Sequence, residues 1–126
     1  MASIKTNTHR SNLAKAATGA QALPAIVKVA IGSGGVDGAG NPKGLTGSEN
    51  ALFTEKLRRN VTITHPTPYT ARFTIVVDAT ADNLAGVSIN EAALVDSAGN
   101  LAAIKTFSNK SLDTGDVITF DYDELF

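Results

Sequence analysis

The most informative stretch of this 126-residue chain is Ile89-Asn90-Glu91-Ala92-Ala93-Leu94-Val95-Asp96-Ser97-Ala98-Gly99-Asn100-Leu101-Ala102-Ala103-Ile104. It belongs to two extended apolar runs, residues 87–95 and 101–107, which border the short polar sequence 96–100. Two such runs on either side of a glycine-containing turn are typical of a β-hairpin. The sequence therefore predicts a pair of antiparallel strands, and we expect the rest of the fold to form around it.

Four further strands are predicted outside this hairpin. Residues 25–31 are rich in β-branched side chains, residues 57–64 alternate between two faces, and residues 69–78 combine both features. Residues 116–122 provide the last strand after a polar loop. We therefore expect about six strands in an antiparallel, β-sandwich-like domain.

Two short helices are predicted in the N-terminal half. Residues 9–18 are rich in alanine, contain no Pro or Gly, and are followed by Gly19. Thr46 and Glu49 have the spacing of a capping box, which predicts a second helix over residues 50–56. The apolar face of the first helix is thin, so it must dock on something to be stable. Together these elements predict a mainly β, α+β fold in a single domain, residues 1–126.

Residues 32–47 form a glycine-rich loop that contains seven of the 11 glycines in the chain. A loop of this length in a compact domain is expected to be functional or mobile. It matches no known phosphate or calcium loop, because Asp37 occupies the third glycine position of a dinucleotide fingerprint. Ala39 stands where a calcium loop needs an oxygen ligand. We therefore expect no cofactor.

The composition excludes several classes of function. There are 11 basic and 12 acidic residues, and the resulting net charge of −1 argues against a general nucleic-acid binder. The absence of Cys excludes thiol catalysis, disulfides and Cys-based zinc sites. No apolar run approaches the ~20 residues of a membrane span, so we expect no membrane partner.

The charges are distributed unevenly along the chain. The first 60 residues contain eight basic and three acidic side chains, whereas the remaining residues contain three and nine. Two interpretations are open. The two halves could mix their charges over one surface, or the asymmetry could favour head-to-tail contacts between copies.

No set of converging catalytic residues is visible. The two histidines, His9 and His65, lack the close spacing of a metal-binding pair, and no Gly-x-Ser-x-Gly motif supports a serine nucleophile. We therefore expect no catalytic, cofactor-binding or metal-binding residues, and a protein that is not an enzyme.

The C-terminal tail, residues 123–126, allows two interpretations. It could run into solvent, or Phe126 could act as a hook that anchors in a pocket of a neighbour. On the second interpretation, deletion of residues 123–126 should weaken assembly and leave folding intact. With the tip of the glycine-rich loop, this tail forms the predicted interface. The predicted interface residues are Gly34, Gly35, Val36, Asp37, Asn41, Lys43, Asp123, Glu124, Leu125 and Phe126.

Three stretches in order carry a family resemblance: residues 27–35, residues 45–52 leading to 57–59, and the hairpin 89–104. Their order resembles a family of bacteriophage tail proteins typified by the N-terminal attachment domains of tail (collar) fibres. The resemblance covers about residues 10–122, and the hairpin is its most specific part. Fibres of that family continue into a shaft and a receptor-binding tip, so we expect an adaptor rather than a receptor-binding protein.

The resemblance implies a non-enzymatic virion structural protein of the tail or baseplate, made in the cytoplasm of a bacterial host. Its implied partners are copies of itself and other virion structural proteins, with no nucleic acid and no membrane. A capsid decoration protein is the alternative within the structural class. A carbohydrate-binding module is the alternative from another class, and it would need a platform of aromatic residues. Only Tyr69 and Tyr122 are available for that platform besides five Phe.

Overall fold

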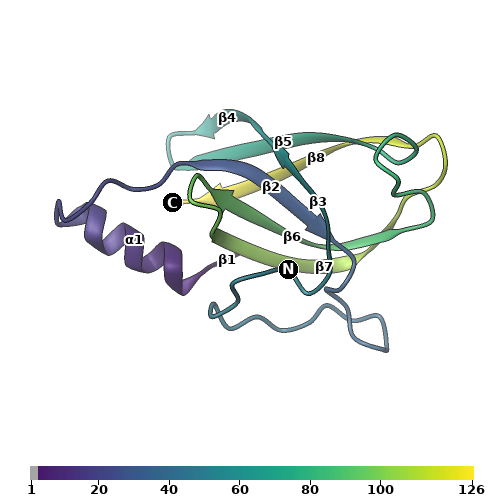
Figure 1. Cartoon of the computed structure of the whole chain (residues 1–126), viewed down its shortest axis with the longest axis horizontal. Helices are drawn as coiled ribbons and strands as arrows, with labels where there is room; N and C mark the ends of the chain where they lie inside the picture. Colours follow the sequence, from purple (N-terminus) through teal and green to yellow (C-terminus); the bar gives the residue numbers. More distant parts are fainter. Residues whose placement is uncertain (1–2) are drawn as a thin grey trace.

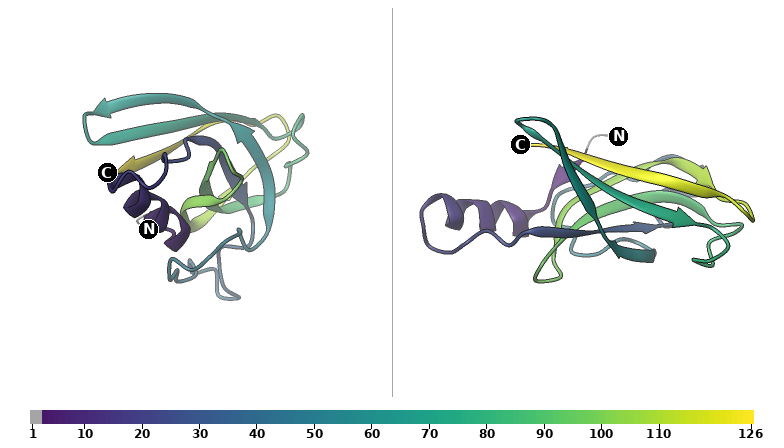
Figure 2. Two further views of the ribbon diagram at one scale, coloured as in Figure 1. Left: turned by 60° about the vertical axis from the view of Figure 1, so that its left-hand side comes forward. Right: turned by 90° about the horizontal axis from the view of Figure 1, so that it is seen from above.

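Two antiparallel β-sheets pack face to face, with a helix at one end of the molecule (Figures 1 and 2). The structure is a computed structural model that describes residues 3–126, which form eight strands and one helix. These elements are β1 (Ile4–Lys5), α1 (Asn7–Ala17), β2 (Ile26–Gly32), β3 (Glu55–Asn60), β4 (Thr62–Thr67), β5 (Thr70–Asp78), β6 (Ser88–Asp96), β7 (Leu101–Ser111) and β8 (Val117–Leu125). The expected β-rich α+β fold is confirmed.

The large sheet has the strand order β1-β7-β6-β2-β3, and the small sheet has the order β4-β5-β8. The main core lies between them and includes Tyr122 and Val77, both fully buried. A smaller apolar cluster covers the other face of the large sheet, where Leu52 and Leu45 pack on Ala93 and neighbouring side chains. Because both faces of the large sheet are covered, β6 is buried along nearly its whole length.

The small sheet has only one covered face. In β8 the side chains at 120, 122 and 124 are buried, and those between them are exposed. This alternation follows from the twofold period of a strand with one face in the core and the other in solvent. The outer face of the small sheet is therefore a solvent-exposed surface.

The predicted hairpin is confirmed, with β6 paired to β7 across the turn at 97–100. The strand count of about six is wrong, because residues 3–126 contain eight strands. The predicted strand 57–64 is in fact two strands, since the chain leaves the large sheet after Asn60 and enters the small sheet at Thr62. The second missing strand is β1, which is too short to produce an apolar pattern.

The first predicted helix is confirmed as α1, with Thr6 as its N-cap accepting from the N–H of His9 at 3.1 Å. The second predicted helix is wrong. One half of the capping box forms, since the N–H of Thr46 donates to the Glu49 carboxylate at 3.1 Å, but Thr46 Oγ1 accepts from the N–H of Ser48 instead of Glu49. No helix follows, because the N–H groups of Phe53 and Thr54 donate to a distant carboxylate and β3 begins directly after them.

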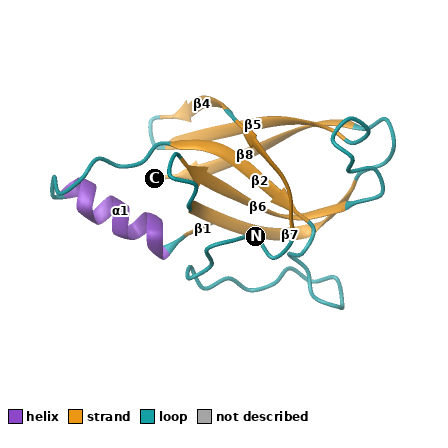
Figure 3. Ribbon diagram, in the orientation of Figure 1, coloured by secondary structure: helices purple, strands orange, loops and turns teal. Residues whose placement is uncertain are grey.

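The long axis of the molecule has two different ends (Figure 3). At the helix end, α1 projects beyond the sheets, and its one buried side chain is His9. The β4–β5 turn, the β6–β7 turn and the C-terminus lie at this end too. At the loop end, residues 79–87 and 112–116 connect the strands of the two sheets. We call these two regions the helix end and the loop end.

Candidate assembly surfaces

The glycine-rich loop is fixed to β6 by a buried carboxylate. Glu91 is fully buried, and its Oε2 accepts from the N–H groups of Gly34 and Thr54, both at 2.8 Å. Its Oε1 accepts from the N–H of Phe53, also at 2.8 Å. Three backbone donors satisfy this charge, so Glu91 joins β6 to the start of the loop and to the segment that precedes β3.

The loop approaches β6 so closely that two of the predicted interface residues have no room for a side chain. A Cβ on Gly34 would lie 2.6 Å from Thr54 Oγ1, and one on Gly35 would lie 2.8 Å from Glu91 Cβ. The N–H of Gly35 donates to Asn90 Oδ1 at 2.6 Å. Gly34 and Gly35 therefore pack against their own chain, which needs glycine here for close approach of the backbones.

The longest exposed run of the loop is its tip, residues 37–41. Asp37 Oδ1 accepts from the N–H groups of Ala39 and Asn41 at 2.9 and 3.0 Å, and Val36 forms a bridge with Pro42. At the base of the tip, Lys43 Nζ lies 4.4 Å from the centre of the Phe53 ring. The predicted residues Val36, Asp37, Asn41 and Lys43 thus form a hydrogen-bonded arm that projects from the large sheet.

The predicted C-terminal tail belongs mostly to β8. Asp123 is paired in register with Arg72 of β5, which donates to its carboxylate at 2.8 and 2.9 Å. These hydrogen bonds lower the pKa of Asp123 below its usual value. Glu124 is buried and lies 3.4 Å from Lys5 Nζ, and Leu125 pairs with Thr70. Residues 123–125 are therefore part of a strand rather than a free tail, so we now expect deletion of residues 123–126 to affect folding as well as assembly.

Phe126 lines a pocket of its own chain rather than extending away from it. Its N–H donates to the carbonyl oxygen of Tyr69 at 2.8 Å, and Lys5 Nζ lies 5.2 Å from the ring centre. The pocket has a volume of about 340 Å³ and is called the end pocket below. The end pocket is lined by His9, Leu23, Pro24, Ala25, Ile26, Ile63, His65, Ala71, Phe73 and Phe126.

Apolar side chains gather at the helix end, and three of them, Leu23, Ile63 and Phe126, line the end pocket. Eight large apolar side chains are exposed within residues 3–126, and five of them lie at the helix end. These five are Leu23, Ile63, Tyr69, Leu125 and Phe126. Strand β4 is exposed along its whole length, so nothing in residues 3–126 covers that side of the pocket. A surface of this kind is typical of a protein–protein contact.

The two histidines both line the end pocket, although 56 residues separate them in the sequence. His9 is buried, and within residues 3–126 its Nε2 has no hydrogen-bond partner. Burial lowers the pKa of His9, and the nearby charge of Lys5 lowers it further. No local sequence signal could have shown this proximity, because it results from the tertiary positions of α1 and β4 on opposite sides of one pocket.

A second cavity, of about 460 Å³, lies at the open side of the sandwich between β7 and β8. Lys105 and Lys110 line it with Phe107 and Phe120. Lys105 faces inward, with its Nζ 4.3 Å from the centre of the Tyr122 ring, and burial lowers its pKa. An inward-pointing lysine at an open sheet edge discourages the addition of a foreign strand. The inward position of Lys105 in this cavity is therefore explained by protection of the sheet edge.

The structure does not bring the two predicted interface segments together, because the loop tip and the C-terminus lie on different sides of the molecule (Figure 1). Residues 3–126 contain no group of His, Asp and Glu side chains placed to hold a metal ion. Over the same residues, no helix has the length and apolar character needed to cross a bilayer. Comparisons of the chain with known protein families, with curated proteins and with solved structures each found no match.

Proposed function

We propose that this chain is a non-enzymatic virion structural protein that acts through protein–protein assembly. In this proposal it is an adaptor or fibre-attachment component of a phage tail or baseplate, present as a homo-oligomer. Its partners are copies of itself and other virion structural proteins. The placement at the tail rests on the resemblance of the hairpin 89–104 and the two preceding stretches to tail-fibre attachment domains.

The observation that carries the assembly function is the helix end. Five exposed apolar side chains lie at the helix end, three of them (Leu23, Ile63 and Phe126) line the end pocket, and α1 projects beside it with one buried side chain. A helix of 11 residues with so little packing is marginal in water, because most helical stability in proteins comes from burial of an apolar face. Contact with a neighbouring protein would bury this surface and stabilise the helix.

The carbohydrate-binding alternative finds little support in the positions of the tyrosines. Tyr122 is fully buried, and Tyr69 is 70% exposed, so the two cannot form one stacking platform. A capsid decoration protein uses the same kind of assembly surface as a tail adaptor. The position of the chain in the particle is therefore the measurement that separates the two.

The test is to label purified phage particles with a gold-tagged antibody against this chain and to view them by electron microscopy. The particles come from a lysate in which the chain is detected by immunoblot. We expect gold at the tail tip or collar. Gold spread over the head would make the chain a decoration protein, and particles without gold would refute a virion role.

A further inference from the structure

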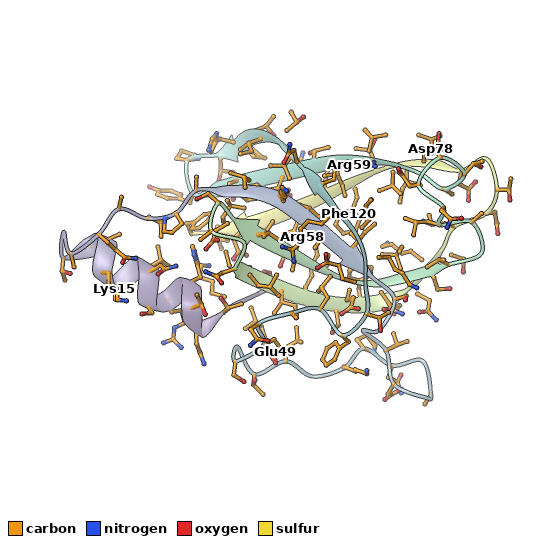
Figure 4. The ribbon with its side chains drawn as sticks, viewed as in Figure 1. Lys15, Glu49, Arg58, Arg59, Asp78 and Phe120 are labelled. Atoms are coloured by element: carbon orange, nitrogen blue, oxygen red, sulfur yellow. The ribbon has the colours of Figure 1, made fainter. Side chains whose placement is uncertain are left out.

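The exposed charges of α1 and of the loop end differ in sign, and the two carboxylates of the helix end that lie near His9, Asp96 and Glu124, are buried. Helix α1 carries Arg10 and Lys15 and no acidic residue, whereas the loop end carries Asp78, Asp113 and Asp116. Figure 4 shows Lys15 and Asp78 at opposite ends of the long axis. Basic residues of the first half of the chain and acidic residues of the second half therefore lie far apart in space at these two positions.

These charges are largely available to a partner. Within residues 3–126, the side chains of Arg10, Lys15 and Asp113 form no ion pair and no hydrogen bond, and all three residues are exposed. Asp116 is half-buried and accepts one hydrogen bond, from the N–H of Asp113 at 2.8 Å. Opposite charges that find no partner in their own chain can pair between chains.

The loop end also presents an apolar patch. Val117 is 61% exposed and Val76 is 53% exposed. The pairing of Val117 with Asp78, and of Val76 with Thr119, places both valines on the outer face of the small sheet. They are therefore diagonal neighbours, with Asp116 directly before Val117 in the chain.

The helix end has the complementary features. Its end pocket is lined by apolar side chains, and Leu23 at the pocket is 41% exposed. His9 lines the same pocket, and its buried Nε2 lacks a hydrogen-bond partner within residues 3–126. Arg10, the next residue, is exposed on α1 and does not line the pocket, so an apolar group that enters the pocket meets His9, and acidic side chains beside that group can reach Arg10 at the surface.

We propose that copies of this chain associate head to tail, with the Val117 patch of one copy seated on the end pocket of the next. Asp113 and Asp116 of the first copy then face Arg10 and Lys15 of the second. This contact deepens the proposed assembly function and rests on it for its biological role. Because the two surfaces are different, the contact propagates, and it closes into a ring or extends into a filament according to the rotation between copies.

The test uses one substitution at each end. Leu23→Asp places an acid at the end pocket, and Val117→Asp removes the apolar contact at the loop end. Both side chains are exposed, so circular dichroism should show a native fold for both variants. Phe53→Asp is the matched control, since Phe53 is 46% exposed and lies at neither end. Self-association is measured by analytical ultracentrifugation at low salt and at about 0.5 M salt, where surface charges are screened.

We expect the wild-type chain and Phe53→Asp to form oligomers at concentrations up to about 0.5 mM, with weaker association at high salt. Each end variant alone should associate at least tenfold more weakly. An equimolar mixture of Leu23→Asp and Val117→Asp should form a 1:1 dimer and nothing larger. The reason is that Leu23→Asp retains an intact loop end and Val117→Asp retains an intact helix end, so the mixture offers only one working pair of surfaces.

Three results would overturn the proposal. The first is a wild-type chain that stays monomeric over this range. The second is association that persists in the end variants, and the third is a mixture that gives no dimer. Gold labelling of particles is independent of all three. A labelled tail with a monomeric chain would support the proposed function and refute this contact. An unlabelled particle with an associating chain would support this contact and refute the proposed function.

Discussion

Glu91→Gln is the substitution that most directly tests how the glycine-rich loop is held. The change keeps the volume of the side chain and removes its charge. The best orientation of the amide leaves its oxygen at the position of Oε2, where it still accepts from Gly34 and Thr54. Its NH₂ group then takes the place of Oε1, which in the wild type lies 2.8 Å from the backbone nitrogen of Phe53. Two hydrogen-bond donors would therefore face each other at this position.

The magnitude follows from these three bonds. A buried N–H that loses a charged acceptor costs about 1.5–3 kcal/mol, and each of the two remaining bonds weakens by about half when its acceptor becomes neutral. Removal of a buried charge from a fully buried site offsets part of this cost. We therefore expect Glu91→Gln to lower the free energy of unfolding by about 3 kcal/mol.

Urea denaturation measures the global effect, and amide hydrogen exchange at Gly34, Phe53 and Thr54 measures the local one. Glu55→Gln is the matched control, because Glu55 is exposed and its ion pair with Arg58 contributes less than about 1 kcal/mol. If Glu91→Gln unfolds within about 0.5 kcal/mol of wild type while the three amides keep their protection, the carboxylate does not hold the loop.

Three further predictions concern single residues. Gly35→Ala should destabilise the fold by more than about 2 kcal/mol, because its Cβ meets β6, whereas Gly38→Ala, which faces open space, should change the unfolding midpoint little in urea titrations. Hydrogen bonds from Arg59 lower the pKa of Asp82 below 3.8, so their contribution is present at neutral pH and is lost as the pH falls below that value. Asp82→Asn should therefore reduce stability at pH 7 and should flatten the acid limb of the stability curve. Burial lowers the pKa of His9 below 6.5, so the unfolded state binds its proton more tightly and stability should fall as the pH drops below 6.5. His9→Leu should remove this slope in denaturation midpoints measured from pH 5 to 8, and a slope equal to that of wild type would contradict the assignment.

The predicted elements that the structure confirms are those whose signal is local. The hairpin formed by β6 and β7 is encoded by two apolar runs and a turn that contains Gly99, which has a φ of +88°. The N-terminal helix is encoded by its alanines and by the glycine that follows it. In both cases, residues close in sequence make the interactions that define the element, so a pattern within a short window is sufficient.

The errors arise where distant residues supply the partner. Residues 50–54 have a helix-start signal, but Glu91 captures two of their N–H groups across 37 and 38 residues. The alternation of residues 57–64 is continuous, but the chain changes sheets at Val61, which no local pattern records. Residues 123–125 look like a polar tail, but backbone pairing with Thr70–Arg72 of β5 makes them part of a strand.

Local patterns in the sequence predict a β-rich domain with a central hairpin, an N-terminal helix and a long glycine-rich loop. The sequence also shows that the two halves of the chain carry opposite charge. The fold is needed to show that Gly34 and Gly35 face inward, that His9 and His65 line one pocket, and that Lys15 and Asp78 lie at opposite ends. The physical reason is that turn chemistry and periodicity act over a few residues, whereas pockets and charged surfaces depend on which strands become neighbours.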